Sequence, residues 1–202
     1  MDSFSEIVIK LARYGINKKV AGNIYKVYHG DSLKKLEEDP YQALGEVRGF
    51  GFKTADNMGR LLGIELNDPR WVRGALLSIL QTALNTLGDT YVALDELLTQ
   101  AYDLVQSTSY DELANSVNEL QRQGKVVVSG DKAALQTIFQ TELDIATELK
   151  HVVNNQVEKE EFDDSDIEKA IKHVEETLEI EYDDTQKNAI KNALNNPISI
   201  LT

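Results

Sequence analysis

Apolar residues recur at helical spacing along most of the chain, so the pattern predicts a mainly α protein. We expect strands to form one small sheet, because β-rich runs are few and short: 90–92, 125–128 and 135–138. The runs with an apolar residue every three or four positions are predicted to be amphipathic helices, and they cover 4–14, 18–28, 32–38, 70–87, 94–105, 110–123, 139–155, 165–178 and 185–194.

Two glycines, one residue apart, interrupt this pattern in the first third of the chain. They fall in Val47–Ala55, which reads apolar-x-Gly-apolar-Gly-x-x-x-Ala. Because glycine tolerates positive φ, Gly49 and Gly51 predict a tight turn. The turn would join a helix-compatible run, residues 41–47, to a second helix that stops at Gly63.

The start of that second helix has the chemistry of an anion site. Its first amides have no acceptor inside the helix and lie at the positive end of the helix dipole. A phosphate is the natural partner of such a turn, and Arg48 and Lys53 add positive charge beside it. The alternative interpretation is a helical hairpin whose glycines only permit close packing.

The spacing resembles the helix-hairpin-helix motif of DNA repair and recombination proteins. A second helix–Gly–helix unit, shorter by one glycine, surrounds Gly15, and the two units are expected to form a compact bundle over residues 1–66. An ordinary helical corner is the alternative for this first unit. The resemblance implies contacts to the DNA backbone without sequence readout, at Gly15, Lys18, Lys19, Arg48, Gly49, Gly51, Lys53 and Thr54.

Residues 67–140 follow the order helix, strand, helix, helix, strand, turn, strand, which predicts a winged-helix-like α+β segment. Its first helix is expected to start at Asn67-Asp68-Pro69, and Trp71 on its apolar stripe is interpreted as a core residue. The helix that enters the major groove in winged-helix DNA readers carries three acids and one arginine here. Such a surface repels phosphate, so we interpret this segment as a scaffold or protein-contact surface.

The net charge of −13 argues against nucleic-acid binding by the chain taken whole. The acidity is concentrated away from the glycine turns: residues 1–75 hold 12 Lys/Arg against 10 Asp/Glu, whereas residues 141–185 hold 4 against 16. Any DNA binding should therefore be weak and salt-sensitive. Absent cysteine, three scattered histidines and the lack of a long apolar run lead us to expect no metal site, no membrane partner and a cytoplasmic protein.

The last third predicts a helical and acidic linker, residues 141–183, with its most acidic part at 158–166. Residues 184–202 then resemble the beginning of a superfamily 1 helicase motor, a RecA-like domain, with a strand at 198–202. The resemblance makes Gln186 the glutamine that contacts adenine. A lone apolar strand at the end of a chain leads us to expect a boundary inside a longer protein.

Together these motifs make the chain resemble the N-terminal half of a RecD-like DNA helicase, related to the RecD subunit of exodeoxyribonuclease V. The resemblance implies ATP-dependent 5′–3′ translocation on single-stranded or forked DNA in repair and recombination, with ATP and Mg²⁺ as cofactors of the longer protein. We assign no catalytic residue to this chain. It lacks the glycine-rich phosphate loop and its lysine, so we expect no ATP hydrolysis by the chain alone.

Two alternatives stay open at this point. In the first, the chain is a non-enzymatic adaptor whose surfaces dock a repair protein, as the acidic balance of residues 76–185 favours. In the second, the hairpins only brace the motor. Substituting Arg48 and Lys53 by Ala separates DNA binding from the adaptor function, and the bracing role is favoured if the chain binds no DNA even at low salt.

Overall fold

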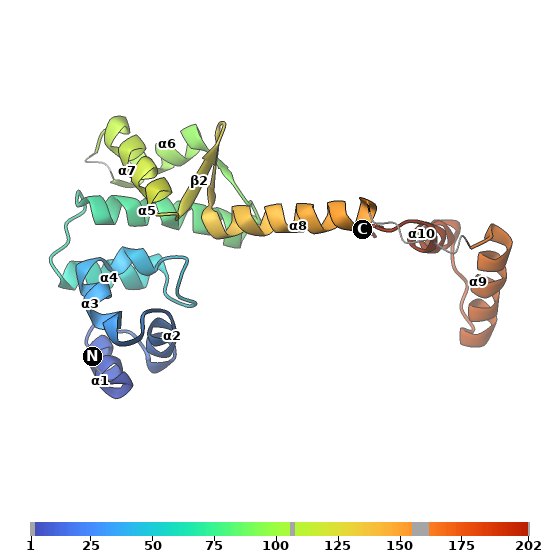
Figure 1. Ribbon diagram of the computed structural model, residues 1–202, viewed down its shortest axis with the longest axis horizontal. Helices are drawn as coiled ribbons and strands as arrows, with labels where there is room; N and C mark the ends of the chain where they lie inside the picture. The colour runs from blue at the N-terminus through green and yellow to red at the C-terminus, as the bar shows by residue number, and fades with distance from the viewer. Residues whose placement is uncertain (1–2, 106–107, 155–161, 202) are drawn as a thin grey trace. The chain divides into compact units, whose positions relative to one another are not determined.

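The computed structural model describes residues 3–105, 108–154 and 162–201, and the chain forms two compact units, Met1–Gln140 and Thr141–Thr202. The described residues are mainly helical, as predicted (Figure 1). One small sheet lies in the first unit.

Short helices build the N-terminal part of the first unit, drawn in blue in Figure 1. Their starts follow from local capping: the Ser3 hydroxyl and the Glu6 carboxylate form a capping box at the first helix, and the Asn17 side chain caps the second. The elements are α1 (Phe4–Ala12), α2 (Lys18–Tyr28), η1 (His29–Asp31), α3 (Ser32–Glu38), η2 (Pro40–Ala43) and α4 (Phe52–Leu61).

The helix predicted over residues 41–47 is wrong in its extent. Only a 3₁₀ turn, η2, forms before the glycine turn. It starts at Pro40, after an extended Asp39, and it ends at Leu44, whose backbone is extended with a ψ of 127°. The first arm of the second hairpin is therefore shorter than the first arm of the first hairpin.

Helix α5 (Pro69–Thr82) starts where the sequence predicts. Its N-cap is Asp68, whose carboxylate accepts from the Arg70 amide at 2.8 Å. The helix continues as a π-helical turn, η3 (Ala83–Leu87), until Gly88 ends it at a φ of 79°.

The winged-helix-like order of elements is confirmed. An antiparallel sheet in the order β1-β3-β2 pairs Val92 with Ala133 and Val127 with Ala134. The returning strand lies at 132–135 rather than 135–138, because the turn closes at Gly130 and Asp131 and the next helix begins at once. The elements are β1 (Val92–Ala93), α6 (Leu94–Val105), α7 (Tyr110–Arg122), β2 (Val126–Ser129) and β3 (Lys132–Leu135).

One hydrophobic core runs through the first unit from Ile7 to Leu135. Helix α5 lies between the bundle and the winged segment (Figure 1), and it contacts α4, α6, α7 and β3. Trp71 is 5% exposed and its indole N–H donates to Asp56 at 2.8 Å, which confirms its core role. Because both parts share this core, the predicted boundary between residues 66 and 67 stays a prediction.

The second unit contains most of α8 (Gln136–Asn154), together with α9 (Asp164–Leu178) and α10 (Asp184–Asn195). Helices α9 and α10 are joined by the ion pairs Lys191–Glu168 at 2.8 Å and Lys187–Glu175 at 3.0 Å. The strand predicted at 198–202 is wrong for 198–201, which form no ladder with any described residue, and residue 202 lies outside the described ranges. So do 158–161 of the predicted acidic linker.

No helix within the described ranges is both long enough and apolar enough to cross a membrane.

Candidate nucleic-acid interface

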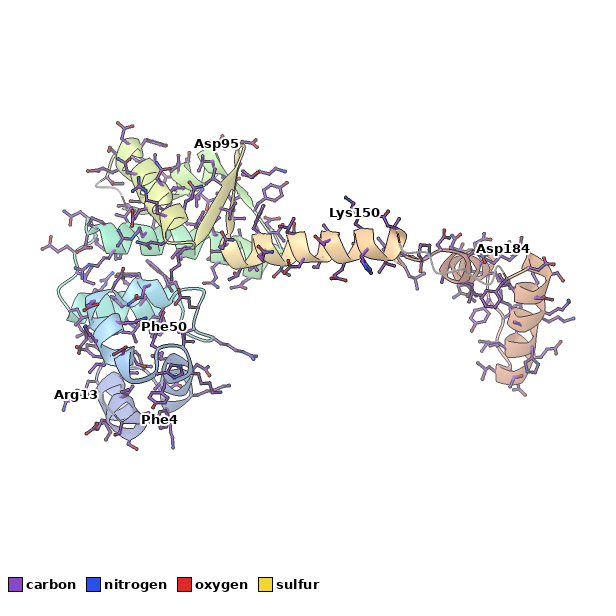
Figure 2. All side chains as sticks on the ribbon, viewed as in Figure 1. Phe4, Arg13, Phe50, Asp95, Lys150 and Asp184 are labelled. Atoms are coloured by element: carbon purple, nitrogen blue, oxygen red, sulfur yellow. The ribbon has the colours of Figure 1, made fainter. Side chains whose placement is uncertain are left out.

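The second glycine turn alternates buried and exposed residues. Val47 and Phe50 are 4% and 3% exposed, and Phe50 lies within the bundle (Figure 2). Arg48, Gly49 and Gly51 are exposed. The two apolar side chains therefore anchor the turn in the core, and the backbone between them faces solvent.

The two glycines have different roles. Gly49 adopts a φ of 83°, a left-handed conformation that disfavours other residues. Gly51 is the N-cap of α4 with a φ of −99°, a conformation open to any residue. A Cβ at Gly51 would meet nothing within 4 Å, so space inside the protein does not require glycine there either. Of the two glycines, only Gly49 uses the positive φ that glycine tolerates.

The backbone amides at the start of α4 are open. Thr54 and Ala55 donate to the Gly51 carbonyl at 3.0 and 3.1 Å. The amides of Gly51, Phe52 and Lys53 have no acceptor among the described residues, and Gly51 has no side chain to cap them. Three amides at the positive end of a helix dipole therefore remain for an external anion.

Helix α2 holds this turn in place. The Asn23 side chain donates to the Arg48 carbonyl at 2.8 Å. A Cβ at Gly49 would lie 3.5 Å from a methyl group of Val20. The second helix of the first hairpin therefore supports the glycine turn of the second.

The first turn resembles the second but is partly closed. Gly15 is exposed with a φ of 76°, and Ile16 beside it is buried. Asn17 stands where Gly51 stands in the second turn, and its side-chain oxygen accepts from the Val20 amide at 3.0 Å. That oxygen occupies one amide and presents a negative partial charge where a phosphate would approach. The second turn is thus the better anion site.

The predicted cations surround the two turns without internal partners. Lys18, Lys19, Arg48 and Lys53 are exposed, and none has an ion-pair partner in residues 3–105, 108–154 or 162–201. Thr54, one residue after Lys53, is half-buried in the first turn of α4. The predicted DNA-contacting residues thus gather at two turns of one bundle.

The acid of the second turn, Glu46, is neutralised. Its carboxylate accepts from Tyr28 Oη at 2.6 Å and pairs with Lys125, whose ammonium also bonds the Gln42 carbonyl. Burial and the bond to Glu46 raise the pKa of Tyr28, so the phenol stays a donor. Lys125 directly precedes β2, so the winged segment supplies the charge that offsets Glu46.

A groove of about 720 Å³ separates this turn from α5 and η3. One wall is the stretch Leu44–Phe52. The other wall, called here the polar ridge, is Ser78, Gln81, Thr82, Asn85 and Thr86. All five ridge side chains are uncharged and polar.

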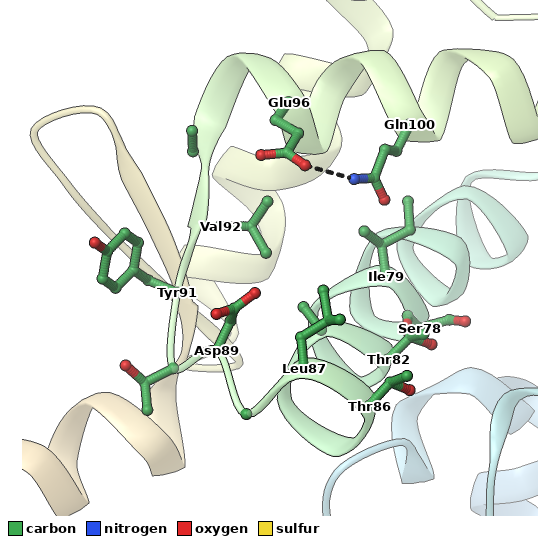
Figure 3. A pocket seen from close by; sticks show the side chains of 14 residues that line it. Ser78, Ile79, Thr82, Thr86, Leu87, Asp89, Tyr91, Val92, Glu96 and Gln100 are labelled. Carbon is green, nitrogen blue, oxygen red and sulfur yellow. Dashed lines mark hydrogen bonds between the residues drawn. The ribbon is translucent and has the colours of Figure 1, made fainter.

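A second pocket, of about 650 Å³, lies on the far side of the same ridge (Figure 3). It shares Ser78, Thr82 and Thr86 with the groove, but its opposite wall comes from β1 and α6. Two acids, Asp89 and Glu96, line it, and Glu96 accepts from Gln100 at 3.0 Å. These carboxylates disfavour a phosphate, so the hairpin side of the ridge is the side suited to an anion.

Sequence reasoning missed the ridge. Its residues recur at positions i, i+3, i+4, i+7 and i+8 of the helix predicted over 70–87, so they share one face. The available signal was an amphipathic helix with no acidic residue over 70–87, in a chain of net charge −13.

Gln186 has a local structural role in the second unit. It is the third residue of α10, where its side-chain oxygen accepts from the Asp183 amide at 3.0 Å and its own amide donates to the Asp183 carboxylate at 2.8 Å. This is a capping box, which any well-formed helix start can use. Its adenine contact stays a prediction.

Comparison with known proteins identifies the first part of the chain. Residues 1–91 match the family model of the HHH domain of the ATP-dependent RecD2 DNA helicase. They form a RecD-like helix-hairpin-helix region. The ATP-dependent RecD2 DNA helicase of Deinococcus radiodurans is 35% identical over 78 residues, which are 39% of this chain and 11% of the relative's length. The resemblance to RecD-like helicases is thereby confirmed for this region.

The RecD-like region contains every part of the groove. Both the glycine turn and the polar ridge fall within residues 1–91. The matched range also extends past residue 66 to include α5 and η3. The residues that form the candidate interface therefore belong to one recognised region.

Proposed function

We propose that this chain is the N-terminal, DNA-binding region of an ATP-dependent DNA helicase that moves 5′ to 3′ in DNA repair and recombination. The observation that carries the DNA-binding part is the open second turn, where three amides and two cations have no partner within the described part of the chain. Backbone amides and Arg/Lys side chains bind phosphates in any sequence, so the contact would position DNA without reading it.

The motor chemistry belongs to the longer protein in this proposal. ATP and Mg²⁺ would be its cofactors, and Gln186 would contact adenine from this chain. The free side-chain NH₂ of Gln186 supports that role, since its oxygen is already used by the capping box. We propose that these 202 residues alone do not hydrolyse ATP, because they contain no glycine-rich phosphate loop.

The test is DNA binding by the purified chain with and without two cations. Fluorescence anisotropy with a labelled oligonucleotide should give a dissociation constant at several salt concentrations. The double variant Arg48→Ala/Lys53→Ala should bind at least tenfold more weakly at low salt and show a shallower salt dependence, since two phosphate contacts are removed.

The matched control is Lys150→Ala/Lys172→Ala, which removes two exposed cations of the second unit. It should leave the affinity within about twofold. Equal affinities for both double variants, with folding unchanged, would show that the second turn does not bind DNA.

The adaptor function keeps one specific observation in its favour. Glu112 and Glu119 lie on the surface that α7 gives to the winged segment. Hydrogen bonds lower the pKa of both carboxyl groups, from the Ser109 backbone to Glu112 and from the Gln123 side chain to Glu119, so both are charged. A basic protein partner would suit this helix better than DNA. In that case Arg48→Ala/Lys53→Ala should leave partner capture intact.

A further inference from the structure

We propose that the groove between the second glycine turn and the polar ridge holds single-stranded DNA and discriminates against duplex. This inference rests on the DNA-binding function proposed above. It adds a discrimination against duplex at this groove and a second set of contacts, on α5 and η3, that the hairpin motif alone does not supply.

The ridge has the chemistry of a nucleic-acid wall. Hydroxyl and carboxamide groups both donate and accept hydrogen bonds, so they can meet sugar oxygens, phosphate oxygens or base edges. Thr82 donates to the Ser78 carbonyl at 2.8 Å. The carboxamides of Gln81 and Asn85 have no hydrogen-bond partner in the described part of the chain and are available to a ligand.

The ridge also lacks the charge that a solvated helix face in this protein would carry. The chain holds 34 Asp and Glu, yet none lies on the ridge. The nearest acid across the groove, Glu46, is neutralised by Lys125 and Tyr28. An anionic strand can therefore enter without meeting an unpaired carboxylate from either wall.

The two walls of the groove contact different parts of a DNA strand. The amides of Gly51 and Phe52, with Arg48 beside them, suit the phosphates. The ridge across the groove then faces the sugars and the base edges. Arg48 is exposed, so its guanidinium can follow the backbone at the mouth of the groove.

The space suits a single strand better than a duplex. A groove of about 720 Å³ is of the size that encloses a small ligand, roughly 300–1,000 Å³, or about one or two nucleotides. In a duplex the bases are paired inside and the phosphates lie on a convex surface, so a duplex on the turn leaves the ridge without contacts. Unpaired bases can be splayed toward such a wall.

The experiment compares two probes on the full 202-residue chain: a labelled 12-nucleotide oligo(dT) and a labelled hairpin duplex. The test variant is Gln81→Ala/Asn85→Ala. The control is Asn118→Ala/Gln121→Ala, which removes the same two residue types from the exposed surface of α7. Urea unfolding of each variant checks that the fold is kept.

We expect the test variant to bind oligo(dT) about tenfold more weakly than wild type, because it loses two neutral hydrogen bonds. Its affinity for the duplex should stay within about twofold of wild type. The control variant should bind oligo(dT) within about twofold of wild type. The salt slope should not change, because no charge is removed. The shape-preserving variant Gln81→Glu/Asn85→Asp should lose more than tenfold at low salt, since it adds two negative charges to the wall.

The outcomes separate this inference from the function on which it rests. If Arg48→Ala/Lys53→Ala weakens binding while both ridge variants bind oligo(dT) like wild type, the ridge inference fails and the turn remains a DNA site. Equal losses for oligo(dT) and duplex would overturn the discrimination. No binding of either probe by wild type at low salt would overturn both proposals.

Discussion

At the scale of single residues, the interface depends on what a side chain leaves free. Asn17 and Gly51 occupy equivalent places in the two hairpin turns, yet Asn17 caps its helix with its own oxygen and Gly51 caps nothing. Compared with an asparagine cap, glycine at an N-cap costs only a few tenths of a kcal/mol, because its backbone is easily solvated. The second turn gives up that small stabilisation and keeps its amides open instead.

Unlike Gly51, Asp68 caps its helix with a charged side chain, and this charge gives a prediction about pH. Its carboxylate accepts from the Arg70 amide and from the Arg70 guanidinium at 2.7 and 3.0 Å, and these bonds lower the pKa of Asp68. A lowered folded-state pKa adds stability above the ordinary carboxyl range, near pH 4, and this stability is lost as the pH falls through the lowered value.

We predict that Asp68→Asn is less stable than wild type by about 1 kcal/mol at pH 7, because it keeps a capping oxygen but loses the charge that faces Arg70. The difference should shrink as the pH falls below about 4. Urea unfolding at pH values from 7 to 2 measures it. A difference that stays constant down to pH 2 would show that the Asp68 charge contributes nothing.

At the scale of elements, Tyr41 joins the bundle to α5. It is 2% exposed, and two glycines make room for it, one on α4 and one on α5. A Cβ at Gly59 would lie 2.5 Å from Tyr41 Oη, and a Cβ at Gly74 would lie 2.4 Å from Tyr41 Cδ1. The ring therefore limits how closely α4 and α5 can approach it, and only glycine fits at these two positions.

We predict that Gly74→Ala destabilises the protein by about 1–3 kcal/mol, because its methyl group collides with the inner part of a buried ring that cannot move aside. The matched control is Gly22→Ala in α2, where a Cβ meets nothing within 4 Å. That variant should gain about 0.5–1 kcal/mol from helix propensity alone. Thermal or urea unfolding of both variants measures the difference, and a stable Gly74→Ala protein would contradict the close approach.

At the scale of the whole molecule, the charge is arranged so that one region tolerates a polyanion. The chain carries −13 overall, yet Lys18, Lys19, Arg48 and Lys53 at the hairpin turns have no ion-pair partner among the residues that the structure describes. The acid of the second turn, Glu46, is neutralised from a distant part of the sequence, since Lys125 lies 79 residues away. The winged segment thus contacts the candidate interface through this ion pair.

We predict that Lys125→Met weakens DNA binding about three- to tenfold, because an unpaired Glu46 then faces the groove. Adding Glu46→Gln to the same protein should restore most of the affinity. Anisotropy titrations of the two single variants and the double variant form the cycle. If Glu46→Gln fails to rescue Lys125→Met, the lysine acts on the fold and not through the charge of Glu46.

The sequence by itself determined the local structure. Helix starts such as Asp68-Pro69 and helix ends such as Gly88 depend on residues a few positions apart, so periodicity and capping located them. The glycine turn and its flanking cations were visible for the same reason. Two predictions were wrong: the run 41–47 forms only a 3₁₀ turn that ends at an extended Leu44, and residues 198–201 form no ladder with any described residue.

Only the tertiary structure decided which amides stay open and what faces them. The different states of the Gly15 and Gly49 turns, the polar ridge across the groove and the Lys125–Glu46 pair all depend on which distant segments come together. Burial and hydrogen bonding are sums over neighbours in space, and a pattern along the chain contains only neighbours in sequence. The helix-hairpin-helix motif could therefore be predicted from the sequence, whereas the groove between that motif and the polar ridge could not.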